Sequence, residues 1–478
     1  MPKIKPASSL LKAHLVTEVL ECGERVTAIR LEYDEEVCSS SVANYINCAQ
    51  SDYHHSPNED TVFNCTYRIE SALYCIDAVS VNNTGCKDDA AYYGRYVFLH
   101  LLQTNNDPLL YTDYVPTCMI PNCNDPRGGV FPKREKLRPI RVHQIREIET
   151  KRGAQIARGS IEAYDEIRLI VDDFQSFQFI TADGHKIDYN VFFPKGYEHY
   201  DVGLENLPLV VYYPSGNART IDYTGKHIGA LGYHCTCWAS EENQQRHPSF
   251  VMAIGGDYPY VEWGDQPDFE HSWVQQAYVD AIRTVCSQYN IDLERIYACS
   301  SGGGGGALWQ TAAANAGLFA GCIIAANDFY SPGGLRNVER GHALMRKIFA
   351  SMKSWIVCEE RDSTGRYAIS DDDARERGDF LRDQARIAQH EGYKINITDR
   401  CQMWNGYLRG EAAECLVREQ IARMPDADAF ISFLIPGTTR TDKHWAERAF
   451  YSNAALRDWL YTCVRRLPDK KEDIKENV

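Results

Sequence analysis

Short runs of β-branched and aromatic residues, in partial alternation with polar residues, dominate the chain between residues 12 and 155. The runs include HLVTEVLEC, RVTAIRLEY, TVFNCTYRIE, YCIDAVSV, RYVFLHLL and IREIET, and turn-forming clusters such as SVNNTG and QTNNDP separate several of them. Alternation with a period of two predicts strands that bury one face. Because no convincing helical pattern interrupts the runs, we expect a β-sandwich in this part of the chain.

The pattern changes near residue 172. The run LPLVVYYPSG, at 207–216, is almost continuously apolar, and IDLERIYACS, LFAGCIIAAN and SWIVCEERD follow it. Such runs are typical of strands buried on both faces of a parallel sheet. Between them, helical spacing connects Val274, Tyr278, Ala281, Ile282, Val285 and Tyr289. Strands that alternate with helices predict an α/β domain with a doubly wound, mostly parallel sheet.

The length of 478 residues suits two or three domains, at roughly 100–200 residues each. We therefore predict an all-β sandwich over 12–160, an α/β domain over 172–466 and a charged C-terminal tail over 467–478. Between the strands of the first domain, NDPRGGVFPKREKLRP is rich in Gly, Pro and charge, which indicates a long loop or the edge of a linker.

Charge and cysteine content narrow the environment of the protein. The chain has 51 Lys and Arg against 66 Asp and Glu, a formal net charge of −15, so we expect no nucleic-acid or membrane-surface partner. No apolar run reaches the ~18 residues of a membrane span, and no signal peptide is visible, which predicts a cytoplasmic protein, or a secreted one if the sequence is a mature form. In the cytoplasm the 17 cysteines stay thiols. An oxidised N-terminal domain is the alternative.

The most informative motif is RIYACSSGGGGGALW, at 295–309. A strand that turns sharply into a helix exposes one side chain at its apex, and small residues flank the apex so that strand and helix can approach each other. This is the nucleophile elbow, G-x-S-x-G. The segment 299–303 fits the motif only with Cys299 in place of the first Gly. A phosphate-binding loop is a poorer match, because the glycine run ends in Gly-Ala-Leu and lacks the required Lys.

A family resemblance rests on six segments in order: FFPKGY, LPLVVYYPSG, WASEENQQRHPSFVMA, NIDLERIYACSSGGGGGALW, LFAGCIIAAN and HWAERAFYSNAALRDWL. Over about 170–465 the chain resembles the α/β-hydrolase serine esterases and peptidases. The nearest are the polyhydroxybutyrate-depolymerase-like and prolyl-oligopeptidase-like enzymes that carry an immunoglobulin-like N-terminal domain. The resemblance implies an α/β-hydrolase domain with a Ser-His-Asp triad, preceded by an immunoglobulin-like sandwich.

The resemblance also implies site residues. In the family, the catalytic acid follows a strand in a G-x-x-D-like pattern, which SWIVCEERDSTG matches at Asp362. The histidine stands seven positions before the Tyr that opens an S-N-x-x-L-x-x-W-L segment; Tyr451 opens that segment here, which gives His444. With Ser301, these residues follow the Ser, Asp, His order of the fold.

Two departures from the family pattern matter. Where family members have His-Gly, this chain has Pro214, which supplies no N–H, so the oxyanion hole would use Ser215 or Gly216 together with the N–H of Gly302. Counting from the RIY of the strand, or back from Trp309, moreover places the family's nucleophile on Gly302. Either the register shifts by one residue and Ser301 stands at the apex, or the nucleophile is missing. Ser300 and Cys299 are weaker candidates, because both should still lie in the strand.

We therefore predict a serine hydrolase that cleaves an ester or peptide-like acyl bond. Its substrate would be a small-molecule or oligomeric ester, and its oligomeric state is open. The alternative is a catalytically degenerate α/β-hydrolase-fold protein, with Gly302 at the nucleophile position, that binds a ligand or a partner. No metal or organic cofactor is expected, because the His-Cys-Thr-Cys sequence at 234–237 lacks the paired spacing of a zinc site.

Overall fold

The computed structural model describes most of the chain between residues 10 and 466. The described residues are 10–21, 23–42, 66–70, 74–103, 134, 136–197, 206–214, 222, 224, 226, 231–255, 273–302, 304–325, 346–359, 383, 386–397, 402–435 and 446–466. They form two compact units, and the boundary between the two lies between Asp172 and Asp173. Each unit is considered by itself.

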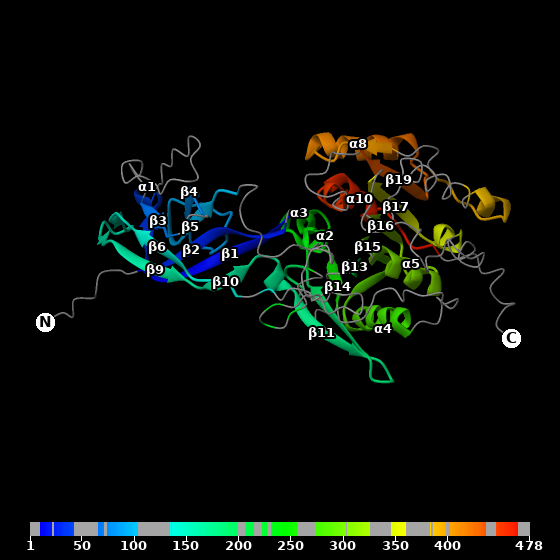
Figure 1. Ribbon diagram of the computed structural model, residues 1–478, viewed down its shortest axis with the longest axis horizontal. Helices are drawn as coiled ribbons and strands as arrows, with labels where there is room; N and C mark the ends of the chain where they lie inside the picture. The colour runs from blue at the N-terminus through cyan, green and yellow to red at the C-terminus, as the bar shows by residue number, and fades with distance from the viewer. Residues whose placement is uncertain are drawn as a thin grey trace, which may run out of the picture. The chain divides into compact units, whose positions relative to one another are not determined.

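The N-terminal unit is built almost entirely from strands (Figure 1). They are β1 Leu10–Leu20, β2 Gly23–Cys38, β3 Tyr67–Ile69, β4 Ile76–Asn82, β5 Tyr93–Leu101, β6 Ile140–Gln144, β7 Ile148–Glu149, β8 Gln155–Ile156, β9 Gly159–Ala163 and β10 Asp165–Arg168. A single turn of helix, α1 (Ser39–Val42), follows β2, and a short 3₁₀ helix, Val171–Asp173, spans the boundary between the units.

Two sheets of this unit share one apolar core. The larger sheet has the order β10-β1-β2-β5-β4 and the smaller one the order β3-β6-β9, while β7 and β8 form a two-stranded ribbon. Buried residues from both sheets, among them Leu31 and Leu99 of the larger and Val142 of the smaller, belong to the same cluster. Within it, the hydroxyl groups of Tyr33 and Tyr67 lie 3.0 Å apart. The N-terminal unit is thus an all-β structure with its core between two sheets.

The C-terminal unit contains a nine-stranded sheet with helices on both faces. Its strands are β11 Gln175–Ile180, β12 Lys186–Phe192, β13 Leu207–Tyr213, β14 Phe250–Gly255, β15 Ile291–Ser301, β16 Gly321–Ala325, β17 Lys353–Glu359, β18 Gln402–Trp404 and β19 Ala429–Leu434. Its helices are α2 Tyr233–Ala239, α3 Glu241–Arg246, α4 Trp273–Gln288, α5 Gly304–Ala314, α8 Glu411–Arg423, α9 Ala446–Tyr451 and α10 Ala454–Tyr461.

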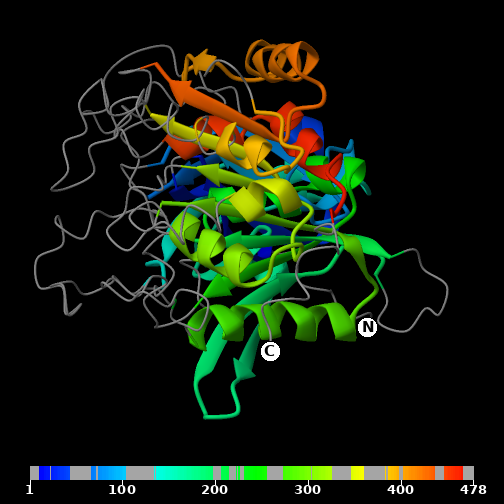
Figure 2. The same cartoon turned by 90° about the vertical axis from the view of Figure 1, so that its right-hand side faces the viewer.

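The strand order is β11-β12-β14-β13-β15-β16-β17-β19-β18. All neighbours from β14 to β18 pair in parallel, and only the β11–β12 and β12–β14 pairs are antiparallel. Helices α4 and α5 contact one face, and α2, α9 and α10 contact the other. Figures 1 and 2 show α8 at the top of this unit and α4 in its lower part. The predicted mostly parallel sheet between helices is confirmed.

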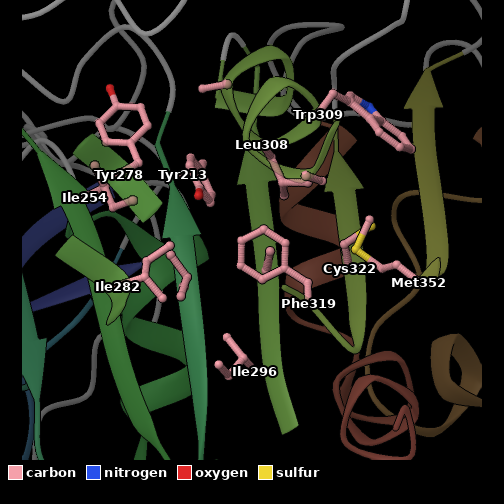
Figure 3. Packing of buried hydrophobic residues seen from close by; sticks show 14 of the residues in the cluster. Tyr213, Ile254, Tyr278, Ile282, Ile296, Leu308, Trp309, Phe319, Cys322 and Met352 are labelled. Carbon is pink, nitrogen blue, oxygen red and sulfur yellow. The ribbon is translucent and has the colours of Figure 1, made fainter. Parts of the chain in front are cut away.

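The core of the C-terminal unit lies between the sheet and the helices α4 and α5. Figure 3 shows Tyr213 of β13 beside Tyr278 and Ile282 of α4, with Leu308 and Trp309 of α5 over the neighbouring strands. Burying such side chains contributes about 1.5–3 kcal/mol each. The apolar helical face predicted between Val274 and Tyr289 is therefore the face that α4 presents to the sheet.

Two parts of the sheet were not predicted. Strand β19 pairs with β17 and extends the parallel sheet, and the three-residue strand β18 forms its edge. The first is a short apolar run, AFISFL, which resembles a helix segment as much as a strand; the second is too short to carry a pattern. In the described part of the chain, no helix is long and apolar enough to cross a membrane.

Several cysteines are buried as thiols in the C-terminal unit. Cys235, Cys237, Cys299, Cys322 and Cys463 are free and buried, and Cys286 is free and half-buried. Burial raises the pKa of the Cys237, Cys286, Cys322 and Cys463 thiols to about 12, and it also raises the pKa of Cys299. These groups are packing elements that stay protonated in the folded protein.

The buried thiols predict a loss of stability in alkali. An unfolded thiol ionises near pH 9, whereas a folded thiol with a raised pKa stays neutral, so the free energy of unfolding should fall as the pH rises from about 9 towards 12. Urea unfolding in the presence of a reductant, at pH 7 and at pH 10, measures this fall. Cys286→Ala should make the fall smaller, and substitution of the exposed Cys415 by Ser should not change it. An unfolding free energy that is equal at both pH values contradicts the prediction.

Candidate active site

The carboxyl ends of five neighbouring strands define one edge of the nine-stranded sheet. Strands β13, β15, β16, β17 and β19 run in parallel, so their last residues lie along the same edge. Register confirms the alignment: Tyr213 pairs with Ser300, Ser301 pairs with Ala325, and Ala325 pairs with Val357. In open α/β sheets this is the edge at which ligands bind.

The turn between β15 and α5 includes Gly302. Strand β15 ends at Ser301 and α5 begins at Gly304. Gly302 has a φ of +48°, in the left-handed region that side chains other than Gly rarely adopt. Its N–H donates to the Ala325 carbonyl at 3.1 Å, and its own carbonyl accepts the N–H of Gly305 at 3.0 Å. Among the described residues of the turn, Gly302 is the one with a left-handed backbone.

The start of α5 supports the same register. A Cβ added to Gly304 would lie 2.1 Å from the Tyr213 carbonyl oxygen and 2.5 Å from that of Pro214, far inside contact distance. Only Gly fits at this close approach between α5 and the end of β13. The elbow motif requires such a small residue two positions after the apex, and counting back two positions from Gly304 gives Gly302.

Ser301 is the last residue of the strand and points below the apex. Its side chain is buried, and its hydroxyl lies 3.0 Å from the Tyr212 hydroxyl. That same phenol lies 3.5 Å from Nδ1 of His234, which α2 places on this face of the sheet. The three polar groups form a buried row beneath the turn. The N–H of Gly302, predicted to stabilise an oxyanion, donates to Ala325 instead.

Tyr451 ties the C-terminal helices to the elbow strand. Its hydroxyl accepts the backbone N–H of Ser300 at 3.0 Å and donates to the Ser300 carbonyl at 2.7 Å. The Ser300 side chain is fully buried, and its hydroxyl has no hydrogen-bond partner among the described residues. Ser300 thus contributes its main chain to the site, as a residue within the strand.

Four predicted site residues, Asp362, His444, Ser215 and Gly216, lie outside the described residues. The elements beside them in the sequence are described. Strand β17 ends three positions before Asp362, helix α9 begins two positions after His444, and β13 ends two positions before Ser215. These assignments stay predictions, and the chain order connects all of them to the same edge of the sheet.

Three side chains near the elbow were not predicted to contribute to the site. Tyr212 lies within an apolar run that gives no sign of a hydrogen-bonding role, and Tyr451 served only as a landmark for His444. His234 was considered only as a metal ligand. The structure buries it within 5.3 Å, ring to ring, of Tyr451. Among the described residues, no three His, Cys, Asp or Glu side chains are placed to hold a metal ion.

Comparison with known proteins identifies the fold. No family model and no curated protein matches the sequence. Among solved structures, a thermostable esterase matches with a TM-score of 0.64 and 21% identity, over 95% of this chain and 100% of that chain. An IroE-like serine hydrolase from Shewanella oneidensis matches with a TM-score of 0.35 and 10% identity, over 60% of this chain and 79% of the other. The S-formylglutathione hydrolase FrmB from Staphylococcus aureus matches with a TM-score of 0.31 and 15% identity, over 45% of this chain and 86% of the other.

The likeness to the thermostable esterase shows that this chain has the α/β-hydrolase fold. The two more distant matches are named hydrolases as well, but their low scores add nothing to the argument. Because the alignment with the esterase spans 95% of this chain, it includes residues of both units. The fold therefore agrees with the expectation from the sequence motifs.

Gly304→Ala should destabilise the C-terminal unit. The added methyl group collides with backbone oxygen atoms that cannot rotate away, so we expect a loss of about 1–3 kcal/mol or more in unfolding free energy. Urea unfolding followed by circular dichroism measures this loss. The matched control is Gly159→Ala, where an added Cβ meets nothing within 4 Å. Equal stability of the two variants would contradict the close approach at Gly304.

Tyr451→Phe should also destabilise the protein, by about 1–3 kcal/mol, because it leaves buried main-chain groups of Ser300 without their partner. Thermal unfolding of the variant, compared with Tyr407→Phe at an exposed position, measures the effect. We also expect faster amide exchange at Ser300, whose N–H loses its acceptor. Unchanged exchange at that amide would contradict the proposed role of the hydroxyl.

Proposed function

We propose that this chain binds an ester or a related acyl compound at the carboxyl edge of its nine-stranded sheet. The support is the α/β-hydrolase fold, shared with a thermostable esterase, and the alignment of five strand ends at one edge, where α/β proteins bind ligands. Whether the bound compound is cleaved depends on which residue stands at the apex of the turn between β15 and α5. The two alternatives are binding without turnover and hydrolysis.

The outcome that the elbow geometry supports best is binding without turnover. The apex residue supplies the nucleophile in this fold, and the positive φ of Gly302 supports a residue without a side chain at that position. The observation that carries the proposal is its φ of +48°; the close approach at Gly304 agrees with it. A Gly at the apex also relieves the backbone strain that a serine would impose there, roughly 1–3 kcal/mol. The protein would then act as a receptor for an acyl compound.

The second candidate is hydrolysis through Ser301. Its hydroxyl lies at the end of β15, next to the apex, and the shared esterase fold favours a hydrolase. In this mechanism Ser301 attacks the carbonyl carbon, His444 takes the proton and returns it to the leaving group, and Asp362 orients the imidazole. Because the N–H of Gly302 donates to Ala325, the oxyanion hole would use N–H groups of Ser215 and Gly216.

For the N-terminal unit we propose an immunoglobulin-like sandwich. The support is its two sheets around one core, with β1 paired in an antiparallel manner with β2 and in parallel with β10. A sandwich of this kind would leave the acyl site to the C-terminal unit. The protein would thus combine a β-sandwich domain and an α/β domain that carries the acyl-binding edge.

A fluorophosphonate that labels serine nucleophiles separates the two outcomes. Under binding without turnover, the wild type stays unlabelled and does not hydrolyse a p-nitrophenyl ester, whereas Gly302→Ser places a hydroxyl at the apex and becomes labelled. Label on that variant should persist when Ser301→Ala is added. Intact mass and peptide mapping identify the labelled residue, and circular dichroism confirms that each variant is folded.

The remaining outcomes of the labelling experiment distinguish the other possibilities. Wild-type labelling that disappears in Ser301→Ala establishes the hydrolase, and His444→Ala should then reduce the labelling rate at least a hundredfold, since the serine loses its base. Wild-type labelling that survives Ser301→Ala points to another nucleophile, such as Ser300. If neither the wild type nor a folded Gly302→Ser variant is labelled, the edge does not accept acyl compounds, and the proposal is wrong.

A further inference from the structure

A second polar site lies at the amino edge of the same sheet, where β17 and β19 begin. A hollow of about 320 Å³ is lined by six polar or charged side chains: Lys353, Lys394, Asn396, Asp426, Asp428 and Arg466. Lys353 is the first residue of β17, and Asp428 immediately precedes β19. Since the strands are parallel, this hollow lies at the opposite edge of the sheet from the elbow. It is therefore independent of the proposed acyl site.

Asp428 holds the walls of the hollow together. Its backbone N–H donates to the Asn396 carbonyl at 2.6 Å, and its carbonyl accepts the N–H of Ser354 at 2.8 Å. Its carboxylate is buried, accepts the Asn396 N–H at 2.7 Å and forms an ion pair with the Arg466 guanidinium. The negative charge of Asp428 is thus already compensated, and the segments that carry the other lining residues are fixed relative to each other.

The two lysines are the groups left to act on a ligand. Within the described part of the chain, no carboxylate lies within 4.0 Å of the Lys353 or Lys394 ammonium group, and no side-chain hydrogen bond engages either one. Three cations and two carboxylates line the hollow, in a chain whose formal net charge is −15. Because Asp428 is paired with Arg466, the charged groups that remain are two lysine ammonium groups and the Asp426 carboxylate, so the lining has a net positive charge. A positive hollow in so acidic a protein attracts anions.

We propose that this hollow binds a small anion that carries a phosphoryl group. The lining has no apolar side chain for an apolar ligand, and its three cations repel a metal ion. Lysine ammonium groups bind phosphate oxygens as point charges, and Arg466 has further N–H groups on its guanidinium. The Asp426 carboxylate should distinguish phosphate from sulfate. Hydrogen phosphate has an O–H that can donate a hydrogen bond to this carboxylate, whereas sulfate at neutral pH has none. The site should therefore prefer phosphate to sulfate.

The test uses the full-length protein and isothermal titration with inorganic phosphate at low ionic strength. We expect binding that weakens about tenfold in Lys353→Gln and in Lys394→Gln, because each variant loses one charge-assisted contact. Lys186→Gln, on β12 and outside the hollow, is the matched control and should bind as the wild type does. Sulfate should bind more weakly than phosphate, and Asp426→Asn should reduce the difference between the two anions. Circular dichroism verifies the fold of each variant.

A titration with glycerol phosphate identifies the source of the phosphoryl group. Tighter binding than that of inorganic phosphate assigns a phosphorylated small molecule, and weaker binding assigns free phosphate; both agree with the proposal. Absence of phosphate binding, or phosphate binding that neither lysine substitution weakens, overturns it. Equal affinity for sulfate and phosphate in the wild type overturns the phosphoryl assignment. None of these results depends on whether the elbow binds or hydrolyses acyl compounds.

Discussion

The approach of helix α5 to strand β13 at Gly304 is the constraint on which the candidate site depends. The Tyr213 and Pro214 carbonyl oxygens occupy the space in which a side chain at Gly304 would lie, so the helix can start there only with a glycine. Once α5 starts at that point, only Gly302 and Gly303 remain between strand and helix, and the reversal of direction requires a positive φ, which Gly302 supplies. The identity of the apex residue is thus a consequence of packing, and the chemistry available at the edge follows from it.

Hydrogen bonds from two other elements, α9 and β13, hold the end of β15. Tyr451 of α9 engages the main chain of Ser300 on both its N–H and its carbonyl, and Tyr212 of β13 engages the hydroxyl of Ser301. His234 of α2 completes the row. These groups are buried, so their hydrogen bonds are made inside the protein and fix the end of the strand. Through its hydrogen bond to Tyr212, the Ser301 side chain helps to hold the end of β15 in place.

The two ends of the parallel sheet differ in chemistry. Among the described residues of the carboxyl edge, the Tyr212 and Ser301 hydroxyl groups are buried and hydrogen-bonded to each other. The amino edge near β17 and β19 presents charged side chains around a hollow, with a buried carboxylate, Asp428, that organises them. An open α/β sheet has two such edges, and residues on different segments can be brought together at each one without disturbing the core between them. This separation permits two independent ligand sites in one unit.

The fold of the C-terminal unit could be predicted from the amino-acid sequence, because buried strands such as 207–213 and the apolar face of α4 are local patterns with characteristic periods. The sequence also located the strand-to-helix motif and limited the apex to Ser301 or Gly302. Only the tertiary structure gives a geometric reason to prefer Gly302, since that reason depends on contacts of Gly304 with the carbonyl oxygens of Tyr213 and Pro214, far away in the sequence. The roles of Tyr212, His234 and Tyr451 likewise depend on contacts between distant segments. A tyrosine within an apolar run has the same local pattern whether its hydroxyl binds a serine or water, so no periodicity in the sequence can reveal the difference.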